Sequence, residues 1–63
     1  MSNVVQIRPK RAFFIDILDD EQHLVNSIRL EAGNIVDAER EGDKIIDNQY
    51  PDASMWTVYS VNL

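Results

Sequence analysis

Residues 11–31 decide the fold, and they read Arg-Ala-Phe-Phe-Ile-Asp-Ile-Leu, then Asp-Asp-Glu-Gln, then His-Leu-Val-Asn-Ser-Ile-Arg-Leu-Glu. The first eight are rich in aromatic and β-branched side chains, which favour a strand. The polar residues 19–22 suit a hairpin loop. Residues 23–31 then form the returning strand. This stretch therefore predicts an antiparallel hairpin.

Side chains alternate between the two faces of a strand, so Phe13 and Phe14 point to opposite sides of the predicted sheet. Asp16 shares a face with Phe14, and burying an unpaired carboxylate is costly. We therefore expect Phe13 to face the core and Phe14 to face outward. The expected core consists of Phe13, Ile15, Ile17, Leu24, Ile28, Leu30, Ile35, Ala38, Ile45, Ile46, Tyr50 and one row of the last strand.

A helix is predicted after the hairpin. Asn34 is a good N-cap residue, and Asp37 completes a weak capping box and suits the positive end of the helix dipole. Apolar residues then keep helical spacing over about four turns. Gly42 lies on this apolar stripe, which indicates a close approach of the helix to the sheet, and Pro51 ends the helix.

Residues 55–63 form a final strand by their aromatic and β-branched content. The order strand–strand–helix–strand predicts a small α+β domain over residues 11–63. Its three-stranded antiparallel sheet has the spatial order second–first–third, with the helix packed on one face. The other face stays open, and it is the most informative surface for function.

Composition limits the possible functions. The chain has 63 residues, a length that allows one domain. Its hydrophobic fraction of 44% is typical of a globular protein. There is no cysteine, hence no thiolate site. No apolar run approaches the roughly 20 residues of a membrane span, and no signal peptide is visible, so we expect a cytoplasmic protein without membrane contact.

Charge divides the chain unevenly. Six basic and eleven acidic residues give a net charge of −5. Residues 1–11 carry three bases and no acid, and residues 12–63 carry three bases and all eleven acids, a charge of −8. Residues 1–10 are predicted to form a basic extended arm, with a frayed terminus as the alternative. The acidic body makes direct nucleic-acid binding unfavourable.

The sequence offers no catalytic set. His23 is the only histidine and lies beside the predicted turn, where Asp19–Glu21 is better explained as a solvated hairpin loop than as a cation site. The two glycines are isolated, so there is no phosphate-binding loop. We expect neither an enzyme nor a bound cofactor or metal.

Over about residues 12–62, the hairpin, Glu31–Ala32, the polar helix, Gln49–Tyr50–Pro51 and the valine-containing last strand resemble the small acidic RNA-polymerase inhibitors of podoviral coliphages. The resemblance implies the same element order and binding to the jaw of bacterial RNA polymerase, which blocks promoter opening. Three departures stand out. The helix is about one turn longer, Asp52–Ser54 replaces a glycine-containing turn, and the family's two binding arginines match Ser60 and Asn62. The fold can carry over, but those arginine contacts cannot.

Three functional hypotheses follow. The first is a phage or prophage accessory protein that binds and inhibits a host nucleic-acid enzyme such as RNA polymerase. The second is a nucleic-acid-mimicking anti-CRISPR or anti-restriction protein. The third is a small regulator or self-associating assembly protein, with a homodimer as one form. The residues predicted to bind a partner are Phe14, Asp16, Leu18, Arg29, Trp56, Arg8, Lys10 and Arg11.

Overall fold

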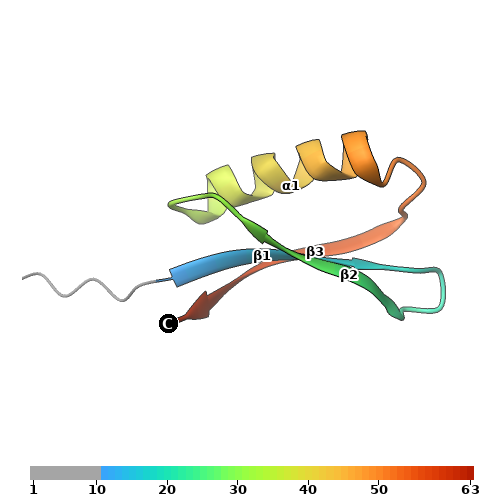
Figure 1. Ribbon diagram of the computed structural model, residues 1–63, viewed down its shortest axis with the longest axis horizontal. Coiled ribbons are helices and arrows are strands. Elements are labelled where there is room, and N and C mark those ends of the chain that lie inside the picture. The colour runs from blue at the N-terminus through green and yellow to red at the C-terminus, as the bar shows by residue number, and fades with distance from the viewer. Residues whose placement is uncertain (1–10) are drawn as a thin grey trace, which may run out of the picture.

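A computed structural model describes residues 11–63, which form one antiparallel sheet and one helix (Figure 1). The elements are β1 (Arg11–Leu18), β2 (Leu24–Leu30), α1 (Ile35–Gln49) and β3 (Met55–Asn62). The sheet order is β2-β1-β3, and α1 lies along one face. The predicted fold class and strand order are confirmed. The predicted arm, residues 1–10, lies outside the described residues.

β1 is the central strand because it is the most apolar and is paired along both edges. Phe13 lies opposite Leu30 of β2 and Ser60 of β3. The pairing with β3 runs without interruption from Arg11 to Leu18, whereas the pairing with β2 shifts register between Ile17 and Leu18. Only β1 is therefore protected on both sides by the described strands.

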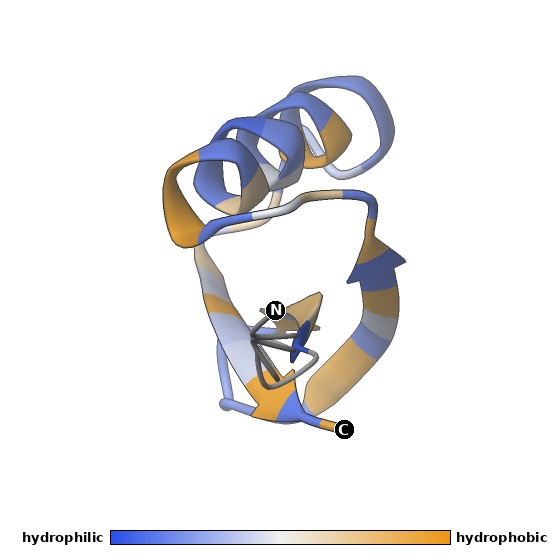
Figure 2. Ribbon diagram, turned by 90° about the vertical axis from the view of Figure 1, so that its left-hand side faces the viewer, coloured by the Kyte–Doolittle hydropathy of each residue, from blue (hydrophilic) through white to orange (hydrophobic). Residues whose placement is uncertain are grey.

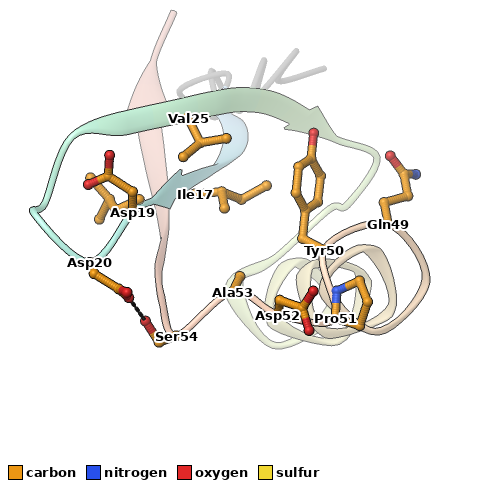
Figure 3. Close-up of a pocket in the computed structure, with 11 residues that line it drawn as sticks. Ile17, Asp19, Asp20, Val25, Gln49, Tyr50, Pro51, Asp52, Ala53 and Ser54 are labelled. Atoms are coloured by element: carbon orange, nitrogen blue, oxygen red, sulfur yellow. Dashed lines mark hydrogen bonds between the residues drawn. The ribbon is translucent and has the colours of Figure 1, made fainter.

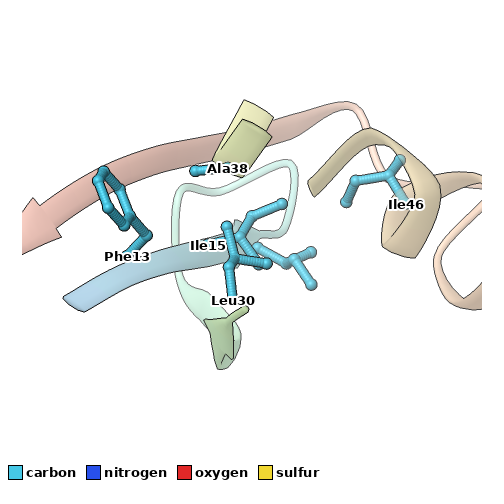
Figure 4. Close-up of a cluster of buried hydrophobic side chains, with 6 residues drawn as sticks. Phe13, Ile15, Leu30, Ala38 and Ile46 are labelled. Atoms are coloured by element: carbon cyan, nitrogen blue, oxygen red, sulfur yellow. The ribbon is translucent and has the colours of Figure 1, made fainter. Parts of the chain in front are cut away.

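The core fills the space between α1 and the inward rows of the sheet (Figure 4). Phe13 is 5% exposed and Ile15 is fully buried, as predicted, and Phe14 points to the other face. The buried cluster is Phe13, Ile15, Ile17, Leu30, Ala38 and Ile46. The predicted core residues Ile28, Ile45 and Tyr50 are half-buried against it, and Val58 is the last-strand residue that packs there.

The prediction that Leu24 lies in the core is wrong, since its side chain is 60% exposed. Ile17 pairs with Asn26 and Leu18 with Leu24, so Val25 is an extra residue in β2, a β-bulge. The bulge reverses the alternation, and Leu24 shares the outward face with Leu18. Val25 itself borders a hollow with Ile17 and Tyr50.

Two further residues differ from the expected core. Ile35 is 45% exposed, because it is the first residue of α1 and borders an open hollow beside Phe13 and Ser60. Ala12 is 3% exposed although it lies on the outward face. Its methyl group is small and belongs to the central strand, which is paired along both edges.

The predicted ends of α1 are confirmed. The Asn34 side chain accepts a hydrogen bond from the Asp37 backbone N–H at 2.9 Å, and its amide donates to the Asp37 carboxylate at 3.1 Å. At the other end, Tyr50 is the C-cap residue and Pro51 follows. The Asn26 amide donates to the Tyr50 hydroxyl at 2.9 Å, which ties the end of α1 to β2.

The hairpin loop is built on Asp19. Its Oδ1 accepts hydrogen bonds from the backbone N–H groups of Glu21 (2.9 Å) and His23 (2.8 Å), as expected of an aspartate that nucleates a turn. Gln22 has a positive φ of 66°, a left-handed conformation that L residues rarely adopt. The acidic loop is thus explained by its own backbone hydrogen bonds.

Candidate protein-binding face

The face of the sheet opposite α1 is the candidate site, and it is called the open face below. Directly paired residues of antiparallel strands point to the same side, so the pairing defines its members. They are Ala12, Phe14, Asp16 and Leu18 of β1, Leu24, Ser27 and Arg29 of β2, and Met55, Thr57, Tyr59 and Val61 of β3. No described helix covers this side of the sheet (Figure 1).

An aromatic pair lies at the centre of the open face. Phe14 and Tyr59 are cross-strand partners, and their rings stack with centroids 5.8 Å apart and planes at 22°. Both side chains are half-buried by this contact. Stacked aromatic pairs are rigid and present a large apolar area, which is a property of anchors in protein interfaces.

Asp16 is held beside this pair by two hydroxyl groups. Its Oδ1 accepts hydrogen bonds from the Ser27 hydroxyl at 2.6 Å and the Tyr59 hydroxyl at 3.1 Å. The carboxylate is thereby fixed between β2 and β3, while its Oδ2 accepts no hydrogen bond from the described residues. One carboxylate oxygen is free to meet a donor on a partner.

Apolar side chains flank this polar centre on both sides. Leu18, Leu24 and Met55 lie at the hairpin end, where Leu24 is 60% exposed. Val61 lies at the opposite end and is 40% exposed. Among the open-face residues of the three described strands, Asp16 is the only carboxylate and Arg29 the only base, so their charges cancel. An apolar surface with a few fixed polar groups fits a protein partner better than a nucleic acid.

The structure brings four of the predicted partner-binding residues together: Phe14, Asp16, Leu18 and Arg29 all lie on the open face. Arg29 is the exposed neighbour of Phe14 on β2. Arg11 is exposed at the start of β1, but its place in the alternation puts it with Phe13 on the helix side. Arg8 and Lys10 lie outside the described residues.

Trp56 lies on the helix side of the sheet, away from the other predicted residues. It pairs with Ile17, is 39% exposed and borders a hollow of about 250 Å³ with Glu39 and Asp43 of α1 and with Val58. Trp56 and Tyr59 therefore point to opposite faces of the sheet, as their spacing along one strand requires. If Trp56 contacts a partner, that contact is separate from one on the open face.

α1 presents the acidic surface of the described chain. Its acids are Asp37, Glu39, Glu41, Asp43 and Asp47, against the bases Arg40 and Lys44. Within residues 11–63, the only carboxylate within 4 Å of a lysine or arginine is Glu41, whose Oε1 lies 3.4 Å from the Lys44 Nζ. Figure 2 shows that most of the helix ribbon has the hydrophilic colour. This surface therefore keeps most of its negative charge uncompensated by the described bases.

The hollow that Val25 borders has a volume of about 380 Å³ and opens where the hairpin loop meets the connection from α1 to β3 (Figure 3). Ile17, Val25 and the Tyr50 ring border it, and Asp19 and Asp20 lie at its edge. The Asp20 carboxylate accepts a hydrogen bond from the Ser54 hydroxyl at 2.9 Å, which joins the two loops. The arrangement is structural, with Asp20 already engaged.

The carboxylates and the histidine do not assemble a metal site. In the described part of the chain, no group of three or more such side chains is placed to hold an ion. His23 is 73% exposed, and its Nδ1 lies 3.6 Å from Asp19 and 3.7 Å from Glu21. This is a loose surface contact of the hairpin loop.

The helix found in residues 11–63 is too short and too polar to cross a membrane. Comparisons of the chain with protein-family models, with curated proteins and with solved structures found no significant match.

Two of the open-face residues that were not among the predicted partner-binding residues change the picture of this face. Tyr59 is the more important, because it stacks on Phe14 and donates to Asp16. The sequence feature that could have identified Tyr59 is the alternation of side chains along the last strand. Once β3 is paired with β1, this alternation places Tyr59 on the same face as Phe14. Leu24 had no such signal, since the bulge at Val25 is invisible in the apolar pattern.

Proposed function

We propose that this chain is a small phage or prophage accessory protein that binds and inhibits a nucleic-acid enzyme of the bacterial host, such as RNA polymerase. The observation that carries the proposal is that the two sides of the domain differ in polarity and in charge. The open face is apolar and electrically neutral, while the outer surface of α1, on the other side of the sheet, is acidic.

The open face supplies the contact with the enzyme. The Phe14–Tyr59 pair forms the anchor, because its rings are already fixed and lose little side-chain entropy on binding. Asp16 and Arg29 supply the polar contacts beside the anchor, and Leu18 adds apolar area. A partner surface with an apolar pocket and a hydrogen-bond donor matches this face.

The acidic helix supplies the inhibition. A partner bound to the open face leaves α1 on the far side of the domain, and in our proposal the contact lies beside the channel that the enzyme keeps for its nucleic acid, so that α1 reaches into it. Its uncompensated carboxylates repel a phosphate backbone there, and they compete for basic side chains that line such a channel. Binding and inhibition are thus assigned to opposite sides of one small sheet.

Purified bacterial RNA polymerase gives the first test. We expect the full chain to bind the enzyme and to reduce transcription from a double-stranded promoter. Phe14→Ala with Tyr59→Ala should abolish both effects. Glu39→Gln, Asp43→Asn and Asp47→Asn together should preserve binding and lose inhibition. A matched control neutralises three exposed acids outside the helix, Glu21→Gln, Glu31→Gln and Asp52→Asn, and should change neither.

Cross-linking in a host lysate, followed by mass spectrometry, extends the test to other enzymes. A DNA or RNA nuclease captured in place of polymerase would favour the anti-CRISPR or anti-restriction hypothesis. The proposal is wrong if no nucleic-acid enzyme is captured and polymerase activity is unchanged. It is also wrong if the helix variant and the control variant reduce inhibition equally.

A further inference from the structure

β3 is an edge strand with unusual chemistry. It is eight residues long, and its sequence Met-Trp-Thr-Val-Tyr-Ser-Val-Asn contains no charge, no proline and no glycine. It pairs with β1 along its full length without a bulge, and no described strand pairs with its other edge. Proteins usually protect such edges with charges, prolines or bulges, because free N–H and C=O groups recruit further strands.

β2, the opposite edge strand, carries the expected protection. It is interrupted by the bulge at Val25 and carries the charged side chain of Arg29. The two edges of one sheet therefore differ: β2 discourages strand addition and β3 permits it. In a chain with eleven acids, an eight-residue edge without any charge is a distinctive feature.

We infer that β3 is the pairing edge for a second copy of this chain, giving a two-fold symmetric dimer with a continuous six-stranded antiparallel sheet. The inference is independent of the proposed function. An uncharged strand is self-complementary, because antiparallel self-pairing brings no like charges opposite each other. Strand addition also gives partners to backbone groups that point outward from every second residue of β3.

The geometry of the sheet limits the pairing of the two copies of β3 to two registers. Paired residues must point to the same face, so the two-fold axis passes beside Val58 or beside Tyr59 when overlap of the strands is greatest. With Val58 opposite its own copy, Trp56 faces Ser60 and Thr57 faces Tyr59 of the second copy. Thr57 with Tyr59 is an aromatic and β-branched pair and Val58 with its copy is a β-branched pair, and such pairs stabilise sheets.

The same axis places the two α1 helices on one face of the joined sheet. Glu39 and Asp43, which border the hollow beside Trp56, then approach their counterparts across the axis. Their repulsion weakens the dimer at low ionic strength, since the Debye length is about 10 Å at 0.1 M salt and about 3 Å at 1 M. The dimer should therefore tighten as salt is raised.

Sedimentation equilibrium of the full chain, between about 10 µM and about 1 mM, covers the affinity range of small interfaces. We expect a monomer–dimer equilibrium that shifts toward the dimer with added salt. Thr57→Lys with Ser60→Lys, both at exposed positions of β3, should weaken the dimer about tenfold or more. Far-UV circular dichroism checks that this variant keeps its fold.

The matched control is Leu24→Lys with Val36→Lys, at side chains 60% and 62% exposed on β2 and α1. Both variants change the net charge from −5 to −3, so general repulsion falls equally. The control should dimerise at least as well as the parent chain. A control that loses the dimer, or an edge variant that keeps it, would place the contact elsewhere.

Isotope-filtered nuclear Overhauser measurements on a mixture of labelled and unlabelled parent chain give a direct readout without any variant. Contacts between Hα atoms of β3 in the two copies, centred on Val58 or Tyr59, would establish the register. A full chain that stays monomeric at about 1 mM in high salt overturns the inference.

Discussion

Replacing Gly42 by alanine tests how tightly α1 is pressed onto the sheet. A Cβ atom at this position would lie 3.0 Å from Val58 Cγ2 and 3.1 Å from Ile15 Cδ1. Carbon atoms prefer separations of about 3.5–4.0 Å, so the neighbours would have to retreat by several tenths of an ångström. Val58 is half-buried on an edge strand and can yield, but Ile15 is fully buried and cannot.

Two opposing effects set the magnitude. Alanine favours a helix over glycine by about 1 kcal/mol, whereas overpacking a core costs about 1–3 kcal/mol. We expect Gly42→Ala to lower the free energy of unfolding by about 1 kcal/mol. In a domain of this size, that lowers the melting temperature by about 4–8 °C.

Gly33→Ala is the matched control. Nothing lies within 4 Å of a Cβ built at Gly33, and its φ is not positive. Alanine there should raise stability by about 0.4–1 kcal/mol by restricting the unfolded chain. The two glycine-to-alanine changes should therefore shift urea unfolding midpoints in opposite directions.

A double-mutant cycle assigns the clash to one atom. Ile15→Val removes the Cδ1 that meets the new methyl group, and it costs about 0.5–1.5 kcal/mol alone. Combined with Gly42→Ala, the two losses should be less than additive. If Gly42→Ala alone stabilises the protein as much as Gly33→Ala does, the helix does not approach the sheet as closely as described.

Further predictions concern the core, the cap and the loop. Phe13→Ala should cost about 3–5 kcal/mol, and Phe14→Ala less than half of that, measured by chemical unfolding; the reverse order would mean that the open face is the core. Asn34→Ala should cost about 1 kcal/mol and lower the amide protection of Asp37 in hydrogen exchange, and unchanged protection would rule out the cap. Gln22→Gly should raise the melting temperature slightly, because glycine accepts the φ of 66° without the roughly 1 kcal/mol of left-handed strain; a fall would show that the loop has another conformation.

Most of the fold could be predicted because local signals agree with one another. The apolar row of Phe13, Ile15 and Ile17 and the placement of Asp16 set the register of β1, and Asn34 and Pro51 mark the ends of α1. The bulge at Val25 could not be predicted, since it depends on how the hairpin loop joins the strands and leaves no mark in the apolar pattern. It alone accounts for the error at Leu24.

The candidate site was predicted in part. Phe14, Asp16, Leu18 and Arg29 come from the hairpin, whose register follows from local sequence. Tyr59 joins them through the pairing of β3 with β1, which brings its hydroxyl to Asp16, 43 positions away in the chain, and alternation within one strand does not fix that pairing. Asp16 was predicted to mark the outward face and to bind a partner, but its role as the acceptor for two hydroxyl groups emerges from packing.

The central position of β1 has a consequence for synthesis of the chain. β1 is among the first described segments to leave the ribosome, yet one of its edges is completed by β3, which emerges last. The 44 residues between Leu18 and Asn62 take about 2–9 s to translate at 5–20 residues per second. During these seconds the hairpin exposes the Phe13 row and a bare strand edge, so chaperones or neighbouring nascent chains have a defined time in which to bind it.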